Sequence, residues 1–174
     1  ALDSAAEDVF EFMLERFRFW FEEENISAEV YLAVHALKPR VPLDFVRRAR
    51  AVALFAAEDE SAALSAGYKR VVNILNKLEE PVKVSIDTEL MTESAELALY
   101  KALGGLEHKV ARLIQDADYH GALMALATLR APIDRFFDEV RVMADDPAVK
   151  NNRLALLSHL RAQFVGIADI SRLG

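Results

Sequence analysis

The amino-acid sequence predicts an all-α protein, a bundle of about seven or eight helices that forms one domain over residues 1–174. Three observations predict this class. Apolar residues recur every three or four positions through most of the chain, which is the period of an amphipathic helix. Prolines and capping residues separate these periodic stretches. Finally, 53% of the 174 residues are hydrophobic, which is enough for one sizeable core.

Four helices are predicted in the first half of the chain. Ser4 and Glu7 have the spacing of a capping box, and the first helix then runs to about Glu24. Ser27 caps a short second helix that ends before Pro39. Asp44 precedes the third helix. The third and fourth helices are predicted to cover about 45–57 and 61–78.

Residues 79–91 interrupt the helical period, because they contain Pro81 and alternating β-branched residues. They are predicted to form a connecting loop or an extended strap. A fifth helix covers about 93–115, with Gly104 and Gly105 as a weak point inside it. A sixth covers about 118–130. Pro132 suits the first position of the seventh helix, and Asp146-Pro147 suits the start of the last.

The net charge of −7 is concentrated at the start of the chain. Residues 1–34 hold nine acids and two arginines, so the remaining residues balance at 19 basic and 19 acidic side chains. Residues 38–83 carry nine basic and six acidic side chains. An acidic protein is a poor partner for phosphate, but here the acidity belongs mainly to one helix. The composition therefore does not exclude nucleic-acid binding.

Several kinds of site are not predicted. The chain has no cysteine, which excludes disulfides and thiolate metal sites and fits a cytoplasmic location. The four histidines are isolated, without the spacing of a helical metal site, and no nucleophile has an obvious base. No apolar run approaches the ~20 residues that span a bilayer. We therefore expect no catalytic residue, metal site or membrane segment.

The segment YKRVVNILNK, residues 68–77, is the most informative local pattern. Its apolar residues form a seam that faces a core, whereas Lys69, Asn73 and Lys77 share the opposite face, with Arg70 and Asn76 beside them. Cations and amides in such a row can contact phosphates and base edges together. The alternative is a solvated face with no ligand. The residues alone leave both interpretations open.

A second basic pattern is DFVRRARAV, residues 44–52, in which Arg47, Arg48 and Arg50 fan away from the apolar stripe. The planar fork of arginine suits phosphate. Ion pairs with the acidic first helix are the alternative, and they are favoured for any single one of these arginines.

Asn152 and Arg153 extend the apolar stripe of the last helix instead of facing away from it. Buried amides and cations need polar partners, so structural bracing is favoured over ligand contact. Three nearby acids are candidate partners: Asp138, Asp145 and Asp169. The adjacent Phe136 and Phe137 are interpreted as core residues, not as a platform for stacking bases.

Longer segments resemble a known family. The resemblance is carried by PLDFVRRARAV at 42–52, KRVVNIL at 69–75, LRAPIDRFFDEVRVMADDPAVKNNRLALL at 129–157 and FVGIADISRL at 164–173. These segments resemble the C-terminal region of bacterial glycyl-tRNA synthetase beta subunits, a helical anticodon-binding domain of DALR type. Arg141 and Tyr68 depart from the family pattern. An opening Ala in place of Met is also expected of a fragment of a longer chain.

The resemblance implies a domain that binds the anticodon arm of tRNA(Gly). The whole enzyme would be a glycine–tRNA ligase, an α2β2 assembly with an alpha subunit, using ATP and Mg, with its catalytic centre outside this fragment. The predicted tRNA-binding residues are Arg47, Arg48, Lys69, Arg70, Asn73, Lys77 and Arg153. Arg153 is expected to be at most a phosphate contact. The alternative function is a helical protein-interaction module whose acidic N-terminal helix docks a partner.

Overall fold

The computed structural model describes residues 2–78 and 85–174, with the side chains of α1 described at Val9 and from Glu11 onward. Within these residues the chain forms eight α-helices, two short 3₁₀ helices and no strand, which confirms the all-α prediction. The elements are α1 (Leu2–Glu23), α2 (Ala28–His35), α3 (Pro42–Ala56), α4 (Ser61–Asn76), η1 (Thr88–Leu90), α5 (Ser94–Gln115), α6 (Tyr119–Ala127), α7 (Arg130–Glu139), α8 (Pro147–Val165) and η2 (Ile170–Arg172).

Two predicted helix starts are confirmed with their caps. The Ser27 hydroxyl accepts a hydrogen bond from the Val30 amide at 3.3 Å at the start of α2. At the start of α8, the Asp146 carboxylate accepts from the Ala148 amide at 2.7 Å, and Pro147 occupies the first helical position. Both caps satisfy amides that have no acceptor inside their helix.

Other boundaries differ from the predictions. α3 begins at Pro42, so Asp44 lies inside its first turn instead of preceding it. α7 begins at Arg130, which makes Pro132 its third residue; proline is tolerated there because first-turn amides need no helical acceptor. Gly104 and Gly105 lie within an unbroken α5. Of the predicted strap, residues 79–84 lie outside the described part of the chain, and η1 follows them.

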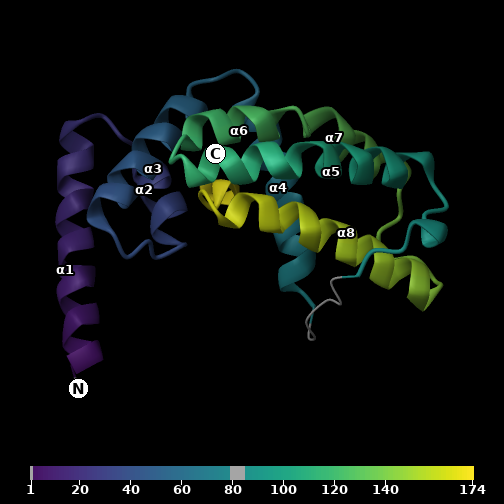
Figure 1. Cartoon of the computed structure of the whole chain (residues 1–174), viewed down its shortest axis with the longest axis horizontal. Helices are drawn as coiled ribbons and strands as arrows, with labels where there is room; N and C mark the ends of the chain where they lie inside the picture. The colour runs from purple at the N-terminus through teal and green to yellow at the C-terminus, as the bar shows by residue number, and fades with distance from the viewer. Residues whose placement is uncertain (1, 79–84) are drawn as a thin grey trace.

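The helices pack around one hydrophobic cluster that extends from Phe21 in α1 to Phe164 in α8. Figure 1 shows α5, α6 and α7 along one side of the molecule, α8 beside α5, and α1 at the far end next to α2 and α3. α4 packs against α7, α8 and η2, and its C-terminal turns extend past α8 in this view (Figure 1). None of the described helices combines the length and apolarity that a membrane crossing requires.

Candidate nucleic-acid interface

The amphipathic pattern of α4 is confirmed by its packing. Leu64, Tyr68, Val71 and Leu75 are buried. The Tyr68 ring lies 4.5 Å from that of Phe164 in α8, measured between centroids. This seam fixes the rotation of α4 about its axis and so determines which residues face solvent.

The opposite face of α4 is polar and cationic. Its exposed polar residues are Lys69, Arg70, Asn73, Asn76 and the C-capping Lys77. No aspartate or glutamate occurs between Ser61 and Asn76. The structure therefore brings together four of the predicted site residues, Lys69, Arg70, Asn73 and Lys77. With Asn76 they form one exposed surface, which we call the α4 face.

Two cations of the α4 face, Lys69 and Arg70, form contacts at the protein surface. Lys69 Nζ lies 3.3 Å from the carbonyl oxygen of Gly174, and the Arg70 guanidinium lies over the Phe137 ring at 4.4 Å from its centroid. Neither residue has an acidic partner among the described side chains. Lys77 also stabilises the negative end of the helix dipole. The charge of this face is therefore available to an anionic ligand.

The three arginines of α3 have different surroundings. Arg47 is exposed. Arg50 contacts Glu24 of α1 at 3.2 Å and lies over the Trp20 ring, as expected for an ion pair with the acidic first helix.

Arg48 points into a polar network between α3, α6 and the end of α8. Its Nε donates to Asp44 at 2.7 Å, and its Nη1 donates to the carbonyl oxygens of Gly166 and Ile167 at 2.5 and 3.0 Å. The guanidinium also stacks on Tyr119, whose hydroxyl donates to Asp44. Burial, and then this hydrogen bond, raise the pKa of Tyr119. The network occupies Arg48, so the structure separates it from the α4 face.

Arg153 lies in the interior between α8 and α5. Its side chain is 6% exposed, and it pairs with Glu96, whose side chain is 1% exposed. Arg153 Nε donates to Glu96 Oε1 at 2.8 Å, and its Nη2 donates to Glu96 Oε2 at 3.2 Å. The remaining guanidinium nitrogen, Nη1, donates to the Arg141 carbonyl at 2.9 Å.

Asn152 is buried beside it and holds the backbone of Asp87. The Asn152 side chain accepts from the Asp87 amide and donates to the Asp87 carbonyl, both at 2.8 Å. Asn152 therefore braces α8 against the segment before α5, and Arg153 braces it against α5. The predicted acidic partners were wrong: Arg141 pairs with Asp145 and Arg172 with Asp169. Arg153 lies apart from the exposed α4 face.

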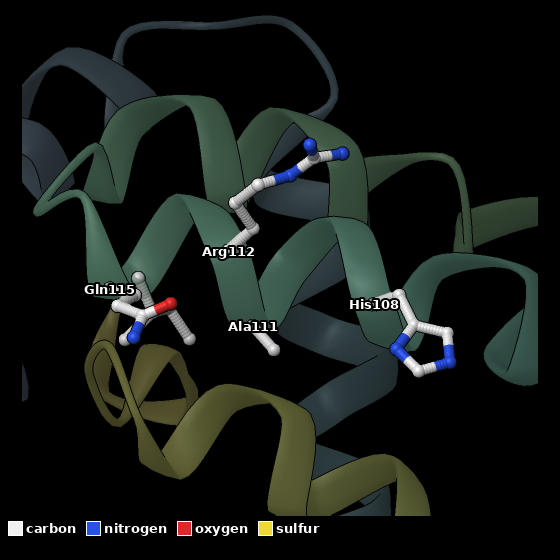
Figure 2. Close-up of a pocket in the computed structure, with 5 residues that line it drawn as sticks. His108, Ala111, Arg112 and Gln115 are labelled. Carbon is white, nitrogen blue, oxygen red and sulfur yellow. The ribbon is translucent and has the colours of Figure 1, made fainter.

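An open pocket of about 670 Å³ lies along α5, and Figure 2 shows the side chains that line it. It is lined by His108, Ala111, Arg112, Ile114 and Gln115. Arg112 points away from the side chains of His108 and Gln115 (Figure 2), so the polar groups do not converge as they do in an active site. Within the described ranges, no group of three or more metal-binding side chains occurs either.

A cationic, amide-bearing helix face has the groups that contact phosphates and bases, and comparison with known families gives a class with that function. The model of the DALR anticodon binding domain matches residues 64–169, from the first turn of α4 to beyond α8. The chain therefore belongs to the DALR anticodon binding domain family.

The individual proteins that are similar to this chain define a narrower class than the family does. The glycine–tRNA ligase beta subunits of Shewanella woodyi and Shewanella baltica are 50% and 49% identical to this chain, over 171 and 170 residues. The beta subunit of Shewanella piezotolerans is 50% identical over 171 residues. Each alignment covers 98% of this chain and 25% of the relative. The chain thus spans about a quarter of the length of these relatives.

Proposed function

We propose that this chain binds the anticodon arm of tRNA(Gly) as one domain of a glycine–tRNA ligase beta subunit. Membership of the anticodon-binding family and similarity to beta subunits over 98% of the chain support this function. The single observation that carries it is the α4 face, where three cations and two amides are exposed without an intervening acid.

The α4 face suits a single-stranded RNA loop. Lys69, Arg70 and Lys77 contact phosphates, and each such contact adds affinity that salt weakens. Asn73 and Asn76 reach exposed bases, because an amide offers both a donor and an acceptor to a base edge. Arg47 supplies a further phosphate contact from α3. Arg48 and Arg153 support the fold.

The proposal extends to the longer protein. This chain spans about a quarter of a beta subunit's length, and the ligase charges tRNA(Gly) with glycine, using ATP and Mg, in an α2β2 assembly with an alpha subunit in the cytoplasm. The described part of this chain contains no convergent catalytic constellation. Its role in that enzyme is to hold the RNA while catalysis takes place elsewhere.

Binding to a labelled tRNA(Gly) anticodon arm at low salt tests this function, beside an arm whose second and third anticodon bases are changed. We expect tighter binding to the native arm. Lys69→Glu should weaken binding to both arms about tenfold and lower the salt slope by about 0.7. Asn73→Ala should mainly reduce discrimination between the arms.

Lys101→Glu is the matched control, because Lys101 is exposed on α5, away from the α4 face. It makes the same charge change and should leave binding nearly unaltered. If Lys69→Glu and Lys101→Glu weaken binding equally, the effect is one of net charge and the α4 face is not the site. If neither arm binds while the full beta subunit discriminates between them, the reading surface lies elsewhere in that subunit.

A protein-interaction module is the second candidate function, and one observation favours it: the acidic α1 exposes large apolar side chains. The two functions predict different footprints. RNA would protect residues 69–77, whereas a protein partner would protect residues 7–24.

A further inference from the structure

α1 presents apolar side chains on two of its faces. On the inner face, Leu14 and Phe21 are fully buried, and the rings of Phe17 and Phe21 lie 6.1 and 5.8 Å from that of Phe45 in α3. On the outer face, Val9, Phe12 and Phe19 are 59%, 58% and 70% exposed. The attachment of α1 to the bundle therefore does not use the apolar side chains of the outer face.

The outer side chains form one stripe. Their spacing places Val9, Phe12, Arg16 and Phe19 along one side of the helix, away from Phe21. The Arg16 guanidinium lies over the Phe12 ring, 5.2 Å from its centroid. Single exposed apolar residues are common on protein surfaces, but a contiguous stripe usually marks an interaction site. A helix that is apolar on opposite sides is typical of one packed between two bodies.

One edge of this outer stripe is acidic. Glu15 and Glu22 lie beside Phe12 and Phe19 on the helix, and both are exposed. Glu22 has only Arg18 as an ion-pair partner, at 3.8 Å, and Glu15 has none among the described residues. Glu11 is already used in holding α1 to α2, because it contacts His35 at 3.2 Å. The complementary surface is therefore apolar with a basic border.

A second copy of this chain is a poor occupant, because residues 1–34 carry the entire net charge of −7 and two such helices would repel each other. A longer polypeptide is a better occupant, since the beta subunits of Shewanella woodyi and Shewanella baltica are similar to this chain and about four times as long. We infer that the outer stripe of α1 packs against an apolar, basic-bordered surface elsewhere in the same polypeptide. This inference rests on the proposed function, which makes the chain one domain of a beta subunit.

Photo-crosslinking in the full-length beta subunit tests this contact. The photoreactive residue p-benzoylphenylalanine replaces Phe12 or Phe19, one at a time, and replaces Leu54 as the control. Leu54 is 60% exposed on α3 and so matches the exposure of the test sites. We expect positions 12 and 19 to give a monomer-sized product joined to peptides outside residues 1–174. Position 54 should give at least about fivefold less.

Charge reversal tests the basic border. Glu15→Lys combined with Glu22→Lys should lower the crosslink yield at position 19 severalfold. Glu107→Lys, at an exposed acid on α5, should leave that yield unchanged.

Three results would overturn the inference: a crosslinked product of twice the subunit mass, a product joined to the alpha subunit, or no product at positions 12 and 19. Anticodon-arm binding is measured on the same variants. RNA binding without a crosslink rejects only the docking of α1, whereas a crosslink without RNA binding rejects only the proposed function.

Discussion

A guanidinium buried away from water needs a hydrogen-bond acceptor for each of its three nitrogens. Each nitrogen of Arg153 has one. Glu96 supplies the carboxylate, and its Oε2 also accepts from the Glu93 amide at 2.9 Å. The same pair therefore closes the first turn of α5 and joins it to α8. The loss of either member would leave the other as an uncompensated charge in the interior.

Glu96→Gln should lower the free energy of unfolding by about 3–5 kcal/mol, because it leaves the Arg153 guanidinium buried without a counter-charge. Arg153→Met should lower the free energy of unfolding by a similar amount, because it leaves the Glu96 carboxylate buried without a counter-charge. Combining Glu96→Gln with Arg153→Met removes both charges and should cost much less than the sum of the two single changes. Urea denaturation of the variants measures these free energies.

Arg135→Met is the comparison, because Arg135 forms an exposed pair with Glu139 on α7. Such exposed pairs contribute little to stability, because water screens the two charges. If Arg153→Met costs no more than Arg135→Met, the buried pair does not hold α5 to α8.

The sequence predicted that Asn152 and Arg153 need polar partners, but it did not identify them. Glu96 lies 57 residues from Arg153 in the chain, whereas the acids that the sequence places near Arg153 are local ones. A signal did exist, because Glu96 shares an inward stripe with Leu99 and Leu103 on α5. Two apolar stripes that each carry one charge, of opposite sign, are expected to meet. The sequence alone did not show which stripes pack together.

At the scale of the element, α5 is weakened by two adjacent glycines that have no packing role in this structure. A Cβ atom built at Gly104 or Gly105 meets nothing within 4 Å. Glycine inside a helix costs about 0.5–1 kcal/mol relative to alanine. We therefore expect Gly104→Ala and Gly105→Ala each to raise stability by about 0.5–1 kcal/mol, measured as an increase in Tm of a few degrees.

Gly67→Ala provides the contrast. A Cβ at Gly67 of α4 would lie 3.0 Å from Cγ2 of Ile133 in α7, so the gain in helix propensity is offset by crowding. Gly67→Ala should be neutral or destabilising. An equal gain at all three positions would mean that packing does not distinguish them.

Helix identity was predictable because long apolar periods and caps are local features. α8 began at Pro147 as expected, and α4 turned its predicted seam inward. The starts of α3 and α7 were not predicted, because Asp44 and Pro132 suit any position in a first helical turn and so do not mark its first residue. The α4 face was predicted from residue type and spacing, whereas the inward position of Arg48 depends on the carbonyls of Gly166, the C-cap of α8, and of Ile167 after it, 118 and 119 residues away.

At the scale of the whole molecule, burial raises the pKa of three tyrosines. For Tyr68 the cause is burial first and then the charge of Asp169; for Tyr31 it is burial and then Glu11. Tyr119 also has a raised pKa. When the pH exceeds 10.0, the ordinary pKa of tyrosine, these tyrosine hydroxyls lose their protons in the unfolded chain but keep them in the folded chain. The contribution of these tyrosines to the free energy of unfolding is therefore fully present below about pH 10 and is lost as the pH rises above it.

Tyr68→Phe should make this alkaline loss of stability shallower, by up to about 1.4 kcal/mol per pH unit above pH 10. Urea denaturation at pH 8, 10 and 11 measures the difference. Tyr100→Phe, at a half-buried position on α5, is the reference substitution. Parallel pH curves for Tyr68→Phe and the unsubstituted chain would contradict the role assigned to Tyr68.

The bond from Arg48 to the carbonyl of Gly166 spans 118 residues of chain, and the Asp169 amide donates to the carbonyl of Ala33 in α2. Both α2 and α3 therefore form hydrogen bonds with residues near the C-terminal end of the described chain. On the ribosome, α2 and α3 would emerge long before these acceptors and donors exist. These hydrogen bonds therefore form late in synthesis. A chain stalled before Gly166 would leave the side chains of the Arg48 network exposed to solvent, and the fold would be incomplete.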